Sequence, residues 1–118
     1  MSPPGLPYTP VVRSGDWLVV SGQLGVVDGK LVNGGTTAEL RQAIANMEAL
    51  LLVEGATLRD VVKTTVFLRH LGTDYDSMNE AYAECFGDHR PARSAIGVSE
   101  LPRGALVEVE AWAHLGAG

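Results

Sequence analysis

The segment from residue 105 to residue 113, Ala-Leu-Val-Glu-Val-Glu-Ala-Trp-Ala, constrains the fold more than any other part of the chain. Successive side chains of a β-strand point to opposite faces of a sheet, so this alternation predicts two different faces. The first face is small and apolar, and we expect it to meet helices: Ala105, Val107, Val109, Ala111 and Ala113. The second is mixed: Leu106, Glu108, Glu110 and Trp112. A Trp and a Leu beside two carboxylates indicate the wall of a subunit interface or a cleft.

Further β segments precede this strand. Residues 16–21 form an apolar, β-type run that Gly22 closes. Asp28-Gly29 lies between apolar pairs and predicts a hairpin, because a type I′ turn requires positive φ angles. Residues 61–68 (VVKTTVFL) are rich in β-branched side chains and predict a central strand, and residues 92–98 predict another.

A helix is expected between these β regions. Five apolar residues recur at helical spacing and form one stripe: Leu40, Ile44, Met47, Leu50 and Leu51. Thr36 and Glu39 have the spacing of a capping box, which places the start of the helix near Thr36. Gly55 is placed to end it, since a left-handed residue commonly follows the last helical turn.

A second helix is expected to begin near Thr73 or Asp74 and to end at Gly87. The predicted order is then β-β-β-α-β-α-β-β within one domain over residues 1–118. Two helices and about six strands predict an α+β sandwich, with a mixed sheet that carries both helices on one face.

Composition excludes several classes of function. The chain has 118 residues and a formal net charge of −5, and its nine Lys and Arg residues do not cluster, which counts against a nucleic-acid partner. The single cysteine, Cys85, cannot form an internal disulfide. Residues 1–10 lack a signal-peptide pattern, and no apolar run approaches the roughly 20 residues of a membrane span. We therefore expect a cytoplasmic protein without a membrane partner.

Two side chains stand out as candidates for chemistry. Arg93, in Pro-Ala-Arg-Ser, can present its planar guanidinium to a carboxylate, although a surface ion pair is the alternative. Glu108 on a strand facing a partly dry cleft would have a raised pKa, which suits proton transfer; the alternative is that Glu108 and Glu110 are only the polar face of a strand. The three histidines have no ligand spacing and no phosphate-binding loop is present, so no metal or nucleotide is indicated.

Several motifs, in order along nearly the whole chain, make the sequence recognisable. They include Ser-Gly-Gln at 21–23, Asp-Val-Val-Lys-Thr-Thr-Val-Phe at 60–67, Met-Asn-Glu-Ala-Tyr at 78–82, Pro-Ala-Arg-Ser at 91–94 and Val-Glu-Val-Glu at 107–110. With these motifs at near-family spacing, the chain resembles the RidA/YjgF family of enamine/imine deaminases.

The resemblance implies a chorismate-mutase-like α+β fold and a homotrimer with active sites in the clefts between subunits. It also implies a small-molecule substrate, a 2-imino or 2-enamino acid of the 2-aminoacrylate type, which is hydrolysed to a 2-keto acid and ammonia. No metal or organic cofactor is implied.

The resemblance also implies roles for individual residues. Arg93 would hold the substrate carboxylate, and Glu108 would position water and exchange protons. The position of Ala95 is often Cys in the family, and its backbone would help to hold the substrate nitrogen or water. Both catalytic side chains are expected to meet in one small cavity that a neighbouring protomer covers. Three more residues match family positions around the pocket: Tyr8, Ser21 and Asn79.

The sequence departs from the family pattern before Pro91, where the loop at 87–90 is short and Arg90 replaces an aromatic residue. This departure keeps open a deaminase of a larger, pathway-specific enamine. Two further alternatives are a ribonuclease or translation inhibitor, which the acidic net charge disfavours, and a non-catalytic protein that binds small carboxylates. Retention of both Arg93 and Glu108 favours catalysis over simple capture, because carboxylate capture needs only the arginine.

Overall fold

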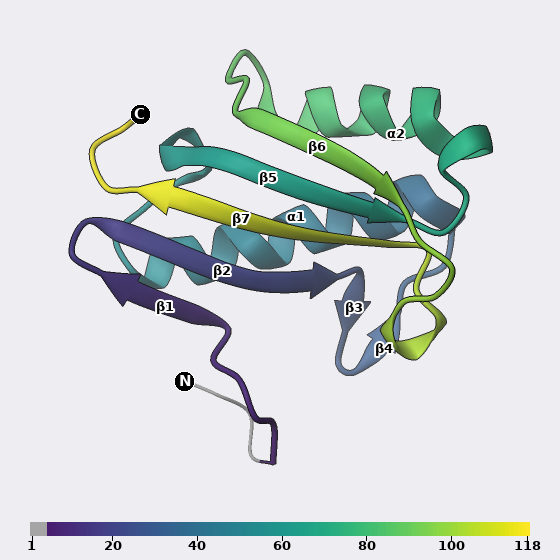
Figure 1. Cartoon of the computed structure of the whole chain (residues 1–118), viewed down its shortest axis with the longest axis horizontal. Helices are drawn as coiled ribbons and strands as arrows, with labels where there is room; N and C mark the ends of the chain where they lie inside the picture. The colour runs from purple at the N-terminus through teal and green to yellow at the C-terminus, as the bar shows by residue number, and fades with distance from the viewer. Residues whose placement is uncertain (1–4) are drawn as a thin grey trace.

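The fold consists of a five-stranded sheet, a small hairpin and two helices, as a computed structural model that describes residues 5–118 shows (Figure 1). The strands are β1 (Val11–Ser14), β2 (Trp17–Leu24), β3 (Val26–Val27), β4 (Lys30–Leu31), β5 (Val61–Leu68), β6 (Ala92–Gly97) and β7 (Val107–His114). The helices are α1 (Gly35–Val53) and α2 (Leu71–Phe86), with short 3-10 turns η1 (Leu58–Asp60) and η2 (Pro102–Gly104). Within residues 5–118, no helix has the length and apolarity needed to cross a membrane.

The sheet has the order β1-β2-β7-β5-β6, with β5 and β6 parallel and the other pairs antiparallel. Both helices lie on the same side, behind the sheet in the view of Figure 1, so the opposite face of the sheet is open. The prediction of a mixed sheet with two helices on one face is confirmed. The first strand, β1, was not foreseen, and the β3–β4 hairpin forms a separate two-stranded sheet.

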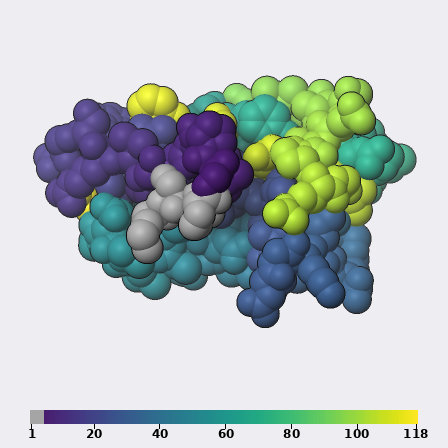
Figure 2. All heavy atoms as spheres, turned by 90° about the horizontal axis from the view of Figure 1, so that it is seen from below, coloured from purple at the N-terminus to yellow at the C-terminus, as the bar shows by residue number. Residues whose placement is uncertain are grey.

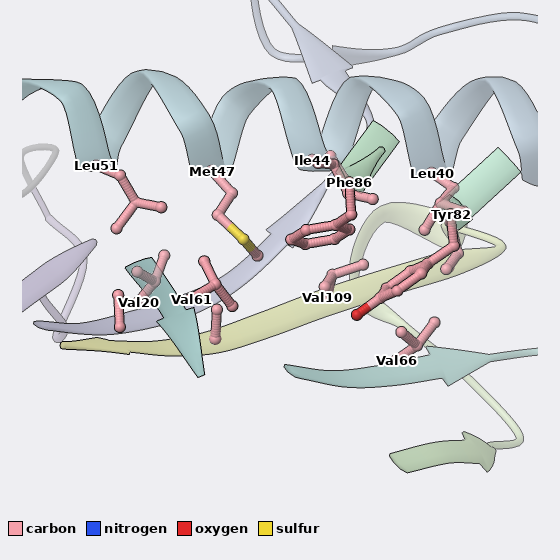
Figure 3. Packing of buried hydrophobic residues seen from close by; sticks show 14 of the residues in the cluster. Val20, Leu40, Ile44, Met47, Leu51, Val61, Val66, Tyr82, Phe86 and Val109 are labelled. Atoms are coloured by element: carbon pink, nitrogen blue, oxygen red, sulfur yellow. The ribbon is translucent and has the colours of Figure 1, made fainter. Parts of the chain in front are cut away.

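The core lies between α1, α2 and the apolar face of β7. Val107, Val109 and Ala111 are almost completely buried, as the alternation along this strand predicts. The apolar stripe of α1 packs against them, with Leu40, Ile44, Met47 and Leu51 pointing at the sheet (Figure 3). Burying one such side chain stabilises a protein by roughly 1.5–3 kcal/mol, so this layer contributes most of the driving force for folding.

Local predictions had mixed outcomes. The hairpin turn is confirmed, because Asp28 and Gly29 both have positive φ angles, 51° and 79°. The second helix begins at Leu71, two to three residues earlier than predicted.

The predicted capping box is wrong, because its two side chains have partners in distant elements. Helix α1 begins at Gly35, with Gly34 in the left-handed region and no side-chain cap. The Thr36 hydroxyl donates to the Asp74 carboxylate at the start of α2 (2.6 Å), and the Glu39 carboxylate accepts from the backbone N–H of Leu106 (2.9 Å). These bonds tie the start of α1 to α2 and to the segment that enters β7.

The connection between β2 and β3 is clamped onto α1. The side-chain amide of Asn46 donates to the carbonyls of Leu24 and Val26, both at 3.0 Å. Between them, Gly25 lies so close to α1 that an added Cβ would be 2.5 Å from the Cα of Glu39. Because the obstacle is helix backbone and not a mobile side chain, only glycine fits here. This contact fixes where β2 ends, and therefore where the residues at its end are placed.

We predict that Gly25→Ala lowers the free energy of unfolding by about 1–3 kcal/mol, because overpacking forces the backbone of α1 to move. The control is Gly72→Ala in α2, where an added Cβ meets nothing within 4 Å. Denaturant titration should show a clear loss for Gly25→Ala and no loss for Gly72→Ala. Equal stability of the two variants would contradict the close approach.

Candidate active site

Arg93 lies on the helix side of the sheet. It is aligned with Thr64 of β5, which in turn is aligned with Ala111 of β7. Thr64 and Ala111 are buried, and the Thr64 hydroxyl shares a 2.6 Å hydrogen bond with the phenol of Tyr82 on α2. Laterally aligned residues share a face of the sheet, so Arg93 points toward α2.

The guanidinium of Arg93 has no carboxylate partner among residues 5–118. One terminal nitrogen donates to the sulfur of Met78 (3.6 Å), which is a weak acceptor, and the other donates to the hydroxyl of Tyr75 (3.4 Å). The charge also lies 5.0 Å from the ring centroid of Tyr82 and 5.8 Å from that of Tyr75. Aromatic rings and a thioether hold the cation but do not neutralise it, so the site is suited to an anion.

An open cavity of about 400 Å³ adjoins this guanidinium. Its lining combines the start of α2 with the helix-facing side chains of β6: Leu71, Gly72, Tyr75, Arg93 and Ala95. Arg93 and Ala95 are two residues apart on one strand and therefore share a face, as the sequence predicts. This cavity offers one positive charge, one phenol and apolar walls to a small acid.

Glu108 lies on the opposite, open face of the sheet. Its carboxylate is directly above the Cα of Gly22 in β2: an added Cβ there would be 2.8 Å from the Glu108 carboxyl carbon and closer still to Oε2. The two strands change register between Val20 and Gln23, and this irregularity brings Gly22 under the carboxylate. Because Gly22 has no side chain, the Glu108 carboxylate can occupy the space above it.

The pKa of Glu108 is raised above its usual range. Partial burial is the main cause, since it disfavours the charged form, and the negative charge of Glu110 adds to it. A raised pKa moves proton exchange by the Glu108 carboxyl group toward neutral pH, which is the direction expected from the sequence.

Glu108 borders a second, larger cavity of about 800 Å³. The N-terminal segment with Leu6 and Tyr8 forms one wall, and η2 with Pro102 and Arg103 forms another. Figure 2 shows these two segments, purple and yellow-green, on the same side of the molecule. The site residue Tyr8 therefore accompanies Glu108 and not Arg93.

Ser21 holds the N-terminal segment in place. Its hydroxyl donates to the carbonyl of Thr9 (2.7 Å), and its backbone N–H donates to the carbonyl of Pro10 (2.8 Å). The hydroxyl proton is thus used within the chain, and Ser21 positions the segment that carries Tyr8.

Asn79 lies on α2, one turn after Tyr75, and it does not line either cavity. Its side-chain oxygen is buried and has no hydrogen-bond partner among residues 5–118. A buried acceptor without a donor is costly, so a donor from a water or a ligand would be stabilising here. Its role at the pocket stays a prediction.

Arg93 and Glu108 do not meet within one chain. The first points toward α2 and the second lies on the open face, so the expectation of one shared cavity is not met in a single protomer. The candidate site consists of two halves: Arg93, Ala95 and Tyr75 on one side of the sheet, and Glu108 with Tyr8 on the other.

The open face also carries large apolar side chains that a lone protomer leaves in water. Trp17 and Trp112 are 41% and 47% exposed, and their rings are in edge contact with centroids 6.1 Å apart. Val12 and Ile96 lie on the same face and are similarly exposed. A patch of this kind marks an interaction surface.

The three histidines lie in different parts of the structure. His89 bonds the carbonyl of Val61 (2.8 Å), His114 lies against the ring of Trp17, and His70 precedes α2. Residues 5–118 contain no group of three side chains able to hold a metal ion.

Comparison with known proteins identifies the family. The family model described as "Endoribonuclease L-PSP" matches residues 2–115. The chain belongs to this family, the RidA/YjgF proteins. A RutC family protein of Pyrococcus horikoshii is 40% identical over 110 residues, which is 92% of this chain and 86% of that protein. Human 2-iminobutanoate/2-iminopropanoate deaminase is 39% identical over 112 residues, 93% of this chain and 81% of that protein.

Solved structures of relatives have the same fold. RidA from an Antarctic Psychrobacter has a TM-score of 0.89 at 33% identity, covering 94% of this chain and 90% of that one. TdcF of E. coli, solved with bound serine, has a TM-score of 0.86 at 31% identity, covering 92% and 87%. The predicted YjgF-like fold is therefore confirmed.

Two residues of the candidate site escaped sequence reasoning. Tyr75 is 41% exposed and borders the Arg93 cavity, although the sequence alone did not single it out. Gly22 was expected to close a β segment, whereas the structure shows it beneath Glu108. The helical spacing of Tyr75 and Asn79 was the only local signal, and it does not distinguish a core residue from one at a cavity.

We predict that Gly22→Ala leaves the fold intact but displaces the Glu108 carboxylate, since the clash involves only a mobile side-chain end. The unfolding transition should change far less than that of Gly25→Ala, while catalytic activity falls as it does in Glu108→Gln. Shortening the acid in Gly22→Ala/Glu108→Asp should restore part of the activity. A fully active Gly22→Ala variant would show that the position of Glu108 is not critical.

Proposed function

We propose that this protein hydrolyses 2-imino acids and their 2-enamino tautomers to 2-keto acids and ammonia. The observation that carries the proposal is the unneutralised guanidinium of Arg93 beside a small cavity. Relatives near 40% identity named 2-iminobutanoate/2-iminopropanoate deaminase support it, and so does the raised pKa of Glu108.

The proposal requires two protomers for each active site. Arg93 of one protomer would face Glu108 of a neighbour, because the two groups lie on opposite sides of one sheet. The exposed Trp17 and Trp112 on the open face support an assembly that covers this face. A homotrimer, with one such cleft at each contact, is the assembly that we propose.

In the proposed reaction, Arg93 binds the carboxylate and holds the adjacent C=N carbon in place. Glu108 accepts a proton from a water molecule as the water oxygen bonds to the carbon of the protonated imine, giving a carbinolamine. Glu108 then returns that proton to nitrogen. The C–N bond breaks with loss of ammonia, and the hydroxyl proton passes to Glu108 as the carbonyl forms. An enamine first takes up a proton at carbon, which gives the protonated imine. The backbone carbonyl of Ala95 would hold the water or the imine nitrogen.

The charge of the protein favours this activity over action on RNA. The family model is described as an endoribonuclease, but the chain has a net charge of −5. Binding of a polyanion depends mainly on clustered Lys and Arg, whereas a small carboxylate needs only one well-placed guanidinium.

We predict that Arg93→Ala lowers kcat/KM by roughly thirty- to a hundredfold, the value of a lost charge-assisted contact of about 2–3 kcal/mol. Glu108→Gln should lower kcat by a similar or larger factor. A pyridoxal-phosphate dehydratase would generate 2-aminoacrylate from serine, and the decay of its imine would be followed.

Matched controls are available for both substitutions. Arg41 and Glu84 form an exposed ion pair between α1 and α2 (2.9 Å), and such pairs contribute little. Arg41→Ala and Glu84→Gln make the same changes of charge and should remain as active as the wild type. Full activity of Arg93→Ala would refute the carboxylate clamp.

We also predict an acidic limb in the pH profile of kcat/KM. Glu108 must be ionised to accept a proton, so activity should rise with pH through its pKa, which lies above the usual glutamate range. Glu110→Gln removes a negative charge that raises this pKa, so the limb should move to lower pH. The rate of the generating enzyme is measured separately at each pH. A limb that stays in place or moves upward would contradict the role of Glu108 as the base.

A further inference from the structure

The hydroxyl of Tyr75 is the most unusual polar group at the Arg93 cavity. The chain has three tyrosines, and the other two have different settings. The phenol of Tyr82 is buried and shares its hydrogen bond with Thr64, while Tyr8 lies at the other cavity. Tyr75 alone combines an exposed ring with a place beside the unneutralised guanidinium.

The hydrogen of this hydroxyl is available to a ligand. The Tyr75 oxygen accepts a weak 3.4 Å hydrogen bond from Arg93, and it makes no other hydrogen bond with residues 5–118. A phenol both accepts and donates, so the O–H remains free. Because the oxygen is only 3.4 Å from a guanidinium nitrogen, one carboxylate oxygen can contact both groups.

We propose that Tyr75 is a second binding group for the substrate carboxylate: its O–H and the Arg93 guanidinium donate to the same carboxylate. This rests on the proposed function, because it assigns the carboxylate to the Arg93 cavity. Three donors, two from the guanidinium and one from the phenol, select a charged, planar carboxylate over an amide or an ester. The substrate class is then 2-imino acids with a free carboxylate directly attached to the imine carbon, bound through that end.

The geometry of the cavity supports this orientation. Leu71 and Gly72 form its apolar part, and Ala95 contributes a methyl group two residues along the strand from Arg93. Among residues 5–118, Arg93 is the only charged residue that lines this cavity. A ligand with one anionic end and a short apolar part matches these walls, with the anion at the Arg93–Tyr75 end.

Tyr75→Phe removes this hydroxyl and keeps the ring. The probe is 2-oxobutanoate, a product-like acid that does not decay, with 2-oxobutanamide as its neutral counterpart; calorimetry gives both Kd values. We expect the Kd of the acid to rise about tenfold, the size of one hydrogen bond to a charged group. The Kd of the amide should change less than about twofold. In the imine assay, KM should rise while kcat is kept, because ground state and transition state both contain the carboxylate.

Tyr82→Phe is the matched control, because its ring also lies against Arg93 (5.0 Å, compared with 5.8 Å for Tyr75) but its hydroxyl is bonded to Thr64. It should lower the melting temperature, by leaving a buried Thr64 hydroxyl unpaired, without changing the Kd of the acid. Tyr75→Phe should raise the Kd of the acid without lowering the melting temperature.

Any of three results would overturn the inference. They are an unchanged Kd of the acid in Tyr75→Phe, an equal fall in the affinities for acid and amide, and a wild type that does not bind the acid. If the acid binds as predicted but the wild type does not accelerate imine decay, the proposed function fails and the carboxylate site stands.

Discussion

Side chains alternate between the two faces of the sheet, and this alternation decides which functional groups can meet within one protomer. Strands β6, β5 and β7 are hydrogen-bonded in a fixed register, so every residue in them is assigned to one face. The register assigns Arg93 to the helix side and Glu108 to the open side. One protomer therefore carries both groups of the proposed site, but it cannot bring them together.

The same alternation links the core to the site. Along β7, the apolar residues that pack on α1 alternate with Glu108 and Glu110. The burial that stabilises the fold therefore also orients Glu108. The clamp of Asn46 and the close approach of Gly25 to α1 fix the end of β2. From there, Gly22 and Ser21 determine where Glu108 and the Tyr8 segment lie. The position of the candidate acid–base group is thus set by packing contacts that extend through the sheet to a helix.

Sequence reasoning was accurate where one local pattern determines the outcome. The alternation along β7 predicted its buried face, and Asp28-Gly29 predicted the hairpin, because strand geometry and turn geometry are local properties. The α+β class followed from these patterns. Arg93 and Glu108 were predicted as site residues from their residue types and the family motifs, and their roles stay a prediction.

What could not be predicted depends on partners distant in the sequence. Thr36 and Glu39 had the spacing of a capping box, but Asp74 and Leu106 bind their side chains instead, and no local pattern reveals that. Whether Arg93 and Glu108 lie on the same side of the sheet depends on how β6, β5 and β7 pair. The number of residues between them does not determine this pairing. Tyr75 became a candidate only when α2 was seen to bring it beside Arg93.

Mixing two defective variants distinguishes a site shared between protomers from a site within one protomer. Arg93→Ala and Glu108→Gln protomers are unfolded together, refolded in equal amounts and assayed for imine hydrolysis, with each variant alone treated identically. If each site takes Arg93 from one protomer and Glu108 from its neighbour, about a quarter of the sites in the mixture contain both groups, since each is intact in half of the protomers. A shared site should therefore restore about a quarter of wild-type activity. A mixture that stays as inactive as its components would contradict a site shared between protomers.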